Sequence, residues 1–323
     1  MMEIKRVLIT GVNGFVGKRT AIALIKQGFA VYGLSMDSNC HVTGMAGYVS
    51  IPIENQEAVY DYVQQQKFDA VVHLAAIVHK RTSDLTERAY DQVNHLASAN
   101  LFQACADAGV KRVLFASTIE VHGNRPETHI DETTPAEPTT FYGRSKLAAE
   151  KALERAAKDG MDYAIMRLAP VYASQFRMNV DKRVYLSNRM AAYYFKKGDY
   201  SFHFLSIDNL VDGIVALLKA EKTEGIYFMA DKNPVSAREL IRLEKAHNGL
   251  KRAFRIPYIP AYIGIFLVDQ ITRLFGPRDS FFSLYNFRKI FRSAQYDISR
   301  IAELTQMDHD VSSTLYKEEE GLI

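Results

Sequence analysis

Tyr142 and Lys146 are the two residues whose types and spacing best suit proton transfer. They stand four apart in FYGRSKLAAE at 141–150, a run predicted to be helical, so both side chains lie on one helix face. A tyrosine with its ordinary pKa of about 10 is a poor base at neutral pH, but a nearby ammonium group stabilises the phenolate and lowers that pKa. Taken alone, such a pair is more often an exposed helix face. Beside a cofactor site, it predicts proton exchange with a substrate hydroxyl or ketone.

A glycine-rich turn near the start of the chain predicts such a cofactor site. In RVLITGVNGFVGK at 6–18, an apolar strand at 7–9 gives way to three glycines spaced GxxGxxG, and a helix is predicted over 18–27. Glycine permits positive φ and a close approach of backbone to ligand, and a helix N-terminus offers free N–H groups to a pyrophosphate. The arrangement predicts a dinucleotide site. Its predicted contacts are Gly11, Asn13, Gly14, Phe15, Val16 and Gly17.

The end of the second predicted strand bears on the choice of dinucleotide. That strand covers 30–34, and in dinucleotide-binding folds an acidic residue at its end accepts the adenosine ribose hydroxyls. Here Ser35 occupies the place, followed by Met36 and Asp37. Serine removes the carboxylate that would repel a 2′-phosphate, which favours NADP, although no arginine follows to bind that phosphate. Asp37 could instead serve NAD, so the sequence leaves NAD and NADP both open.

Strands and helices alternate along the rest of the chain. Further strands are predicted at 48–51, 70–74, 112–116, 163–168 and 226–229, and helices at 55–66, 85–108 and 210–218. This order requires a parallel sheet with right-handed crossovers, which is the doubly wound α/β (Rossmann) fold. We expect an NAD(P)-binding Rossmann domain over 1–170, with returning elements at about 206–235. A smaller C-terminal α/β substrate lobe is expected from 171–205 and 236–323.

Composition and charge exclude several classes of protein. Hydrophobic residues make up 48% of the 323 residues and charged residues 24%, so the chain can bury a substantial core. A net charge of +3 without a basic run argues against nucleic acid as a partner. Cys40 and Cys105 form no disulfide framework and indicate a reducing compartment. Because the first strand starts at residue 7, no signal peptide is predicted and we expect a cytoplasmic protein. No metal site is predicted.

Four passages occur in the type and order found in one known family. They are GVNGFVG at 11–17, HLAA at 73–76, STIEVHG at 117–123 and YGRSKLAAEK at 142–151. The chain resembles the extended short-chain dehydrogenase/reductase family of NAD(P)-dependent nucleotide-sugar epimerases, dehydratases and reductases. The resemblance implies that Thr118, Tyr142 and Lys146 are catalytic. It also implies that Lys146 holds the nicotinamide ribose and that Thr118 bonds the reacting sugar oxygen.

The resemblance extends to the end of the HLAA strand and the helix that follows. It places the backbone of Leu74, Ala75 and Ala76 along the ribose-phosphate side of the cofactor. His73 receives no chemical role, because a strand-end histidine is more often a satisfied hydrogen-bonding group. Asn94 stands where the family often has an asparagine, and an interior helix asparagine bonding nearby backbone is the equal alternative.

Departures from the family pattern bear on the reaction. The 4,6-dehydratases are similar at Glu120, a candidate substrate residue, but have an aspartic acid where this chain has Ile119, so dehydration is not expected. His122 replaces the tyrosine of a VYG-like motif, and Pro52 stands where an adenine-contacting aspartate is common. Many epimerases carry an arginine ahead of the SIDNLVDG passage, where this chain has SFH at 201–203. Another group must then bind a diphosphate.

Other passages are similar to reductases of 4-keto nucleotide sugars from bacterial surface-polysaccharide pathways. They are HLAAIVH (73–79), FRMNVDKR (176–183), SIDNLVDGI (206–214) and KIFRSAQYDISRI (289–301). In those enzymes the counterpart of Asn179 lies near the nucleotide, and Arg288 is a further candidate substrate residue. Other positive charges that could meet a diphosphate are Arg177, Lys182, Arg183 and Arg292.

The resemblance therefore implies hydride transfer at C4 of a nucleotide-activated sugar, with two reactions left open. An epimerase would remove and return the hydride, whereas a 4-keto reductase would consume the reduced cofactor. A non-catalytic NAD(P)-binding sensor is the alternative from another class, although such proteins tend to lose the tyrosine–lysine pair.

Two further expectations concern contacts with other molecules. Residues 256–268 are uncharged but too few for a membrane-spanning helix, which needs about 20 residues. We expect a buried helix of the lobe here and no membrane partner, with association to a membrane surface as the alternative. The resemblance implies a homodimer formed by the helices at about 85–108 and 142–158.

Overall fold

The computed structural model describes residues 3–78, 86–125, 128–185, 191–274, 284, 287 and 293–316. Its central strands are β1 (Arg6–Thr10), β2 (Ala30–Ser35), β3 (Gly47–Ser50), β4 (Ala70–His73), β5 (Arg112–Thr118), β7 (Asp162–Leu168) and β12 (Ile226–Met229). They form a seven-stranded sheet in the order β12-β7-β5-β4-β1-β2-β3, in which every neighbouring pair is parallel. From β1 the strand order runs outward to β2 and β3, and the later strands are added on the other side of β1, beginning with β4. Doubly wound sheets bind ligands at such a switch point, here between β1 and β4. The predicted Rossmann fold is confirmed.

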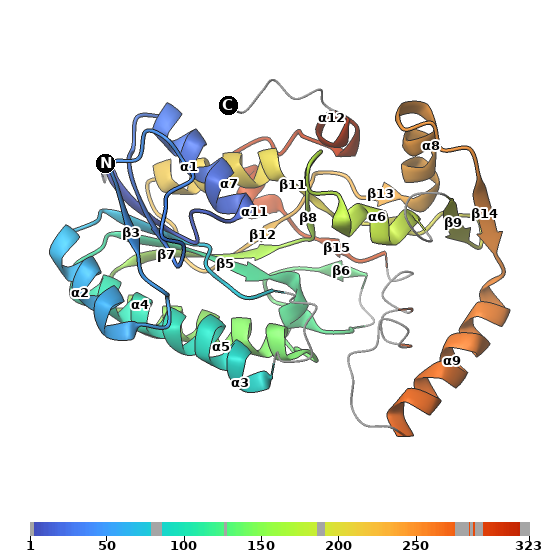
Figure 1. Ribbon diagram of the computed structural model, residues 1–323, viewed down its shortest axis with the longest axis horizontal. Helices are drawn as coiled ribbons and strands as arrows, with labels where there is room; N and C mark the ends of the chain where they lie inside the picture. The colour runs from blue at the N-terminus through green and yellow to red at the C-terminus, as the bar shows by residue number, and fades with distance from the viewer. Residues whose placement is uncertain are drawn as a thin grey trace.

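Helices cover both faces of the sheet, because successive side chains of each strand point to opposite sides. On one face, α1 (Phe15–Lys26) and α7 (Ile207–Lys219) pack over Val7 and Ile9. On the other, α2 (Gln56–Gln66), α4 (Ala97–Asp107) and α5 (Phe141–Ala156) pack over Leu8. Figure 1 shows the two helical layers on either side of the strands. Burial on both faces explains the continuous apolar run in β1.

The helix boundaries refine the sequence expectations in two places. α1 begins at Phe15 rather than at 18, since Gly14 already serves as its N-cap. The helix predicted as one unit over 85–108 consists of α3 (Glu87–Tyr90), a π-helical turn (Asp91–Leu96) and α4. Residue 85 lies outside the described residues. Asn94 is buried inside the π-helical turn, and such turns are frequent at functional sites.

A second hydrophobic core lies in the C-terminal part of the chain. Its strands form short pairs: β8 (Val171–Tyr172) with β11 (Leu205–Ser206), β9 (Ala192–Phe195) with β14 (Ala253–Ile256), and β10 (Ser201–Phe202) with β13 (Val235–Ser236). The helices α6 (Met178–Val184), α8 (Ala237–His247) and α12 (Val311–Leu315) pack around it. β6 (His129–Ile130) pairs with β15 (Gln295–Tyr296). Ile301 of α11 (Ser299–Ala302) joins the core under α1 and α7 instead. The division into two domains stays a prediction.

The expectation of a buried helix at 256–268 is wrong. α9 (Tyr258–Leu274) does form there, but Ile259 is 70% exposed and Leu267 is 54% exposed. Figure 1 shows α9 extending downward from the end of β14, on the side of the molecule opposite α1 and α2. Only one side of the helix contacts the second core, so most of its apolar residues face outward. Within the described residues, no helix is both long and apolar enough to cross a membrane.

Candidate active site

The glycine turn between β1 and α1 is a close-packed cradle. Gly11 has a φ of 71°, and a Cβ there would lie 2.9 Å from the Cα and N of Ala75 at the end of β4. A Cβ on Gly17 would collide with the carbonyl oxygen of Gly11. Glycine is therefore required at both positions, and the N-terminus of α1 is held directly against the turn. The N-cap Gly14 has no side chain to accept a hydrogen bond, so the first-turn N–H groups stay available to a pyrophosphate.

The end of β2 carries a carboxylate after all. Asp37 Oδ2 accepts hydrogen bonds from Asn13 Nδ2 at 2.9 Å and from Ser35 Oγ at 3.1 Å. The Asn13 hydrogen bond, followed by that of Ser35, lowers the pKa of Asp37. Two predicted cofactor residues, Asn13 and Ser35, thus hold an ionised carboxylate beside the glycine turn. This is where a carboxylate can accept hydrogen bonds from ribose hydroxyls.

The end of β4 closes the opposite side of the cradle. Ala75 N donates to Thr10 Oγ1 at 3.3 Å, and Leu74 N donates to Thr10 O at 3.2 Å. Leu74, Ala75 and Ala76 are only half-buried, so they line a surface that a ligand can reach. The glycine turn, Asp37 and these three residues together fit a dinucleotide.

His73 is a satisfied core residue with no free ring nitrogen. Its Nδ1 lies 2.6 Å from Thr10 Oγ1 and its Nε2 lies 2.8 Å from Ser98 Oγ. Since Ser98 Oγ donates to Asn94 O, the ring donates from Nε2 and accepts at Nδ1. Burial, with a smaller contribution from Lys146, lowers the pKa of His73 to about 3. The ring is neutral at physiological pH, and its two hydrogen bonds make it the satisfied strand-end histidine that the sequence favoured.

Asn94 joins the β4 loop to the helix that carries the tyrosine. Its side chain bonds both the N–H and the carbonyl of Ile77, each at 2.9 Å, and donates to Ser145 Oγ at 3.3 Å. Ser145 Oγ in turn donates to Tyr142 O at 2.9 Å. The sequence left open whether Asn94 is the asparagine typical of the family or a helix residue that bonds nearby backbone. In the structure it bonds backbone, but that backbone belongs to Ile77, seventeen residues away. It fixes the position of α5 relative to the cofactor side.

Thr118 and Tyr142 meet at the carboxyl edge of the sheet. Thr118 ends β5, and α5 begins at Phe141 after the N-cap Thr140, whose Oγ1 accepts from Gly143 N and donates to Glu120 Oε2. Burial raises the pKa of the Tyr142 hydroxyl, the Glu120 charge raises it further, and the neighbouring Thr118 hydroxyl opposes the shift. Tyr142 is therefore a protonated phenol at neutral pH.

Lys146 does not lower the pKa of Tyr142 as the sequence predicted. Its Nζ lies 4.2 Å from the centre of the Phe115 ring, and the side chain is 2% exposed. Burial lowers the pKa of Lys146 to about 7, against the raising effect of Glu150. Because a dehydrated ammonium is disfavoured, Lys146 carries only part of its charge near neutral pH. Both members of the pair are thus shifted toward their neutral forms.

A buried polar network behind Lys146 escaped the sequence analysis. Glu150 accepts hydrogen bonds from Arg167 Nε at 3.2 Å and Nη2 at 2.7 Å, and from Ser117 Oγ. Arg167 Nη1 lies 3.0 Å from Nε2 of His122, the residue that replaces the tyrosine of the family motif. The network ties α5 to the end of β5, next to Thr118. Its sequence signal was Glu150, four residues after Lys146, together with an arginine inside the apolar run YAIMRL.

The remaining candidate substrate residues differ in what their side chains contact. Asn179 in α6 donates to Val171 O at 2.9 Å. Arg177 pairs with the buried Glu244 of α8, which commits it to the second core. Arg183 lies over the Phe202 ring at 5.4 Å; burial lowers its pKa, and the Glu120 carboxylate is among the groups that oppose this. Arg288 and Arg292 lie outside the described residues.

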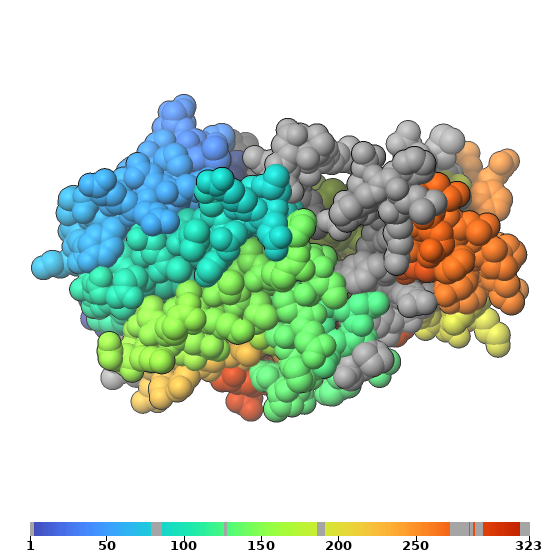
Figure 2. Space-filling model, turned by 90° about the horizontal axis from the view of Figure 1, so that it is seen from below, coloured from blue at the N-terminus to red at the C-terminus, as the bar shows by residue number. Residues whose placement is uncertain are grey.

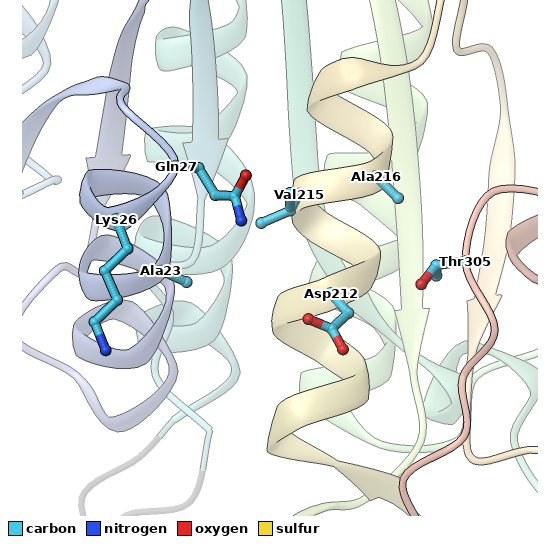
Figure 3. Close-up of a pocket in the computed structure, with 7 residues that line it drawn as sticks. All are labelled: Ala23, Lys26, Gln27, Asp212, Val215, Ala216 and Thr305. Atoms are coloured by element: carbon cyan, nitrogen blue, oxygen red, sulfur yellow. The ribbon is translucent and has the colours of Figure 1, made fainter.

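A surface pocket between α1 and α7 is separate from this site. Figure 3 shows its lining residues, which come from those two helices, from Gln27 directly after α1 and from Thr305. Lys219 Nζ donates to Gln27 Oε1 at 2.6 Å and bridges the same helices. None of the predicted site residues lines this pocket.

The arrangement can bind a dinucleotide and exchange a proton beside it. A family model described as the NAD dependent epimerase/dehydratase family matches residues 7–230. The UDP-glucuronate 4-epimerase of Thermodesulfobacterium geofontis is 28% identical over 258 residues, covering 73% of this chain and 78% of that protein. The UDP-glucose 4-epimerase of Vibrio cholerae is 29% identical over 286 residues, covering 85% of this chain and 84% of that protein.

A solved structure agrees with the observed fold. It is the UDP-glucuronic acid 4-epimerase from Bacillus cereus in complex with NAD, which superposes with a TM-score of 0.71 at 20% identity and covers 96% of this chain and 94% of that chain. Family model, relatives and fold agree with the resemblance that the sequence motifs carried. The chain therefore belongs to the NAD dependent epimerase/dehydratase family, a family of extended short-chain dehydrogenase/reductase enzymes.

Proposed function

We propose that this protein is an NAD-dependent 4-epimerase of a nucleotide-activated sugar. The observation that carries the proposal is the placement of Thr118 next to the buried Tyr142 hydroxyl, at the sheet edge where the glycine turn and the end of β4 also lie. The similarity to 4-epimerases of UDP-glucuronate and UDP-glucose supports reaction at C4. A 4-keto nucleotide-sugar reductase remains the alternative, since the same residues serve a single hydride transfer.

The residues of the proposed site have distinct tasks. The glycine turn, Asp37 and the end of β4 would hold NAD, which would supply reversible hydride transfer at C4 of the sugar. Tyr142 takes the proton of the C4 hydroxyl as that carbon is oxidised, and gives it back to the same oxygen after the keto sugar has presented its other face. Thr118 bonds this oxygen, and Lys146 holds the nicotinamide ribose. Glu120 and Asn179 lie on the substrate side, and Arg288 stays an untested substrate candidate.

Tyr142 needs help to act as a base. Its pKa is raised in the structure, so the phenol is ready to donate a proton but reluctant to accept one. A protonated Lys146 near the hydroxyl would favour the phenolate, and its own pKa of about 7 makes that charge responsive to small changes in its surroundings. We expect cofactor and substrate to bring the two groups into the working state.

Asp37 supports NAD rather than the NADP that Ser35 alone favoured. Its carboxylate is held by Asn13 and Ser35 at the end of β2, where it can accept hydrogen bonds from both ribose hydroxyls. The same negative charge would repel a 2′-phosphate. Asp37→Asn should therefore weaken the preference for NAD over NADP, which competition binding of the two cofactors would measure.

The first test is to denature the purified protein and identify any released nicotinamide cofactor. Stoichiometric NAD supports an epimerase that recycles its cofactor, and UDP-sugars would then be screened for inversion at C4. Tyr142→Phe should lower turnover by about 10²- to 10⁴-fold while cofactor stays bound. Full activity of that variant would contradict the assignment of Tyr142. Net consumption of reduced cofactor with a 4-keto sugar would establish the reductase instead.

We further propose a cytoplasmic homodimer formed by α3, the π-helical turn, α4 and α5. Leu96 in that turn is 44% exposed, and a second copy of the same helices would cover it. Light scattering should give the mass of two chains. A monomeric mass would contradict this part of the proposal without affecting the catalytic assignment.

A further inference from the structure

α9 presents an apolar face to solvent. Ile259, Ile263, Phe266, Leu267 and Ile271 recur at the spacing of one broad helix face, and their exposed fractions range from 41% to 70%. Phe254 in the preceding strand β14 is 48% exposed. Surface helices normally turn such a stripe toward a core. Figures 1 and 2 place α9, in orange, at the end of the molecule away from α1 and α2.

The orientation of α9 is fixed by its opposite side. Tyr258, Ala261, Tyr262 and Ile265 pack against the second hydrophobic core, and Asp269 one turn further along is buried. These residues share a helix face that points away from the exposed stripe. The protein therefore holds the apolar stripe outward as a consequence of its packing.

Positive charge accompanies the stripe. Lys251, Arg252 and Arg255 precede α9 and are all exposed. Between Glu244 and Asp269 the sequence contains no acidic residue, and both of those carboxylates are buried. The exposed charge of this segment is therefore entirely positive. A basic surface beside exposed isoleucine, leucine and phenylalanine matches the interface of a bilayer that contains anionic lipids.

We infer that α9 and residues 251–256 dock on an anionic membrane surface. The apolar stripe enters the boundary between headgroups and acyl chains, α9 lies in the plane of the membrane, and the three cations meet lipid phosphates. This inference goes beyond the proposed epimerase activity and does not depend on it. It replaces the expectation, drawn from the sequence, that the protein has no membrane partner.

The test uses the absence of tryptophan from the chain. Phe266→Trp introduces one fluorophore into the exposed stripe, and Leu304→Trp, at a 39% exposed position outside α9, is the matched control. Vesicles of phosphatidylcholine with phosphatidylglycerol should shift the emission of the Phe266→Trp protein to shorter wavelength and protect it from aqueous quenchers. The Leu304→Trp protein should not respond. Equal responses of the two proteins, or none, would overturn the inference.

Co-sedimentation with the same vesicles separates the two contributions. The triple change Lys251→Gln, Arg252→Gln, Arg255→Gln should weaken binding on the order of a hundredfold, about fivefold for each cation, and added salt should mimic it. Ile259→Gln with Ile263→Gln should abolish binding, and Leu304→Gln should leave it unchanged. Binding that is insensitive to the cations would overturn the anionic-lipid assignment. A second outcome would also overturn the inference. If the unaltered protein fails to sediment with vesicles and is a dimer, and Ile259→Gln with Ile263→Gln makes it a monomer, then a second copy of the chain covers the apolar stripe.

Discussion

α5 and α9 are helices of similar length that treat polarity in opposite ways. α5 buries Lys146 and Glu150, which are each 2% exposed, whereas α9 leaves Ile263 52% exposed. Polarity alone would have exposed the charged residues of α5 and buried the isoleucines of α9. In each helix, a different face decides the orientation: α5 packs through Ala149 and Leu153 against the sheet, and α9 through Tyr262 and Ile265 against the second core. Side chains that break the rule of burial are thus the ones to examine for function.

The buried charges of α5 persist because each has a partner. Arg167 and Ser117 satisfy the carboxylate of Glu150, and the ring of Phe115 lies beside the ammonium of Lys146. Ion pairs in protein interiors contribute little net stability, since desolvation offsets the attraction. Removing one member of such a pair lowers stability strongly, because the other charge is then buried without its partner. The network therefore holds position more than it adds stability.

Glu150→Gln should have the largest effect on stability. The change leaves the buried Arg167 guanidinium without its carboxylate, which should lower the free energy of unfolding by about 3–5 kcal/mol. Urea denaturation measures it. Glu154→Gln, one turn along α5 at an exposed position, is the matched control and should stay within about 0.5 kcal/mol of the parent protein. Similar values for the two variants would show that Arg167 finds water when Glu150 is lost.

Lys146→Met should change how stability depends on pH. The pKa of Lys146 falls from 10.5 to about 7 on folding, so between these values the unfolded chain binds the extra proton. Stability of the parent protein should therefore rise with pH through that range, and below pH 7 the folded protein carries the full cost of the buried charge. Methionine removes this slope, so the variant should gain stability relative to the parent at about pH 6 and lose that gain near about pH 10.

Urea midpoints across this pH range would test the Lys146 prediction. Lys151→Met, at an exposed position on the same helix, provides the control for the loss of a lysine from α5. A parallel shift of the Lys146→Met curve at every pH would contradict the assignment, since it would report packing alone.

The parts of the molecule that depend on backbone geometry could be predicted from the sequence. The glycine spacing located the turn, because Gly11 needs positive φ and Gly17 needs close contact, and both requirements are local. The alternation of strands and helices gave the parallel sheet for a similar reason, since connections between neighbouring elements restrict topology. Four residues of separation also placed Tyr142 and Lys146 on one helix. Their roles in catalysis stay predictions.

The parts of the molecule that depend on tertiary contacts could not be predicted from the sequence. Four-residue spacing does not show that Lys146 turns toward Phe115, so the expected fall in the pKa of Tyr142 was wrong in direction. Asp37 lies two residues beyond the expected acidic position, and only the hydrogen bonds of Asn13 and Ser35 show that its carboxylate turns back. The uncharged run at 256–268 gave the helix but not its exposure, because burial depends on what else is nearby.

Ile263→Ala should have the smallest effect on stability, and it gives the most direct comparison between α9 and α5. A side chain that is 52% exposed loses little on truncation, so the free energy of unfolding should change by no more than about 0.5 kcal/mol. Leu153→Ala in α5 removes a fully buried side chain and should cost about 2–5 kcal/mol. A cost for Ile263→Ala close to that of Leu153→Ala would mean that a second copy already covers the α9 stripe in solution. A small cost means that folding does not require an isoleucine there, and its exposure is then explained by the surface on which α9 docks.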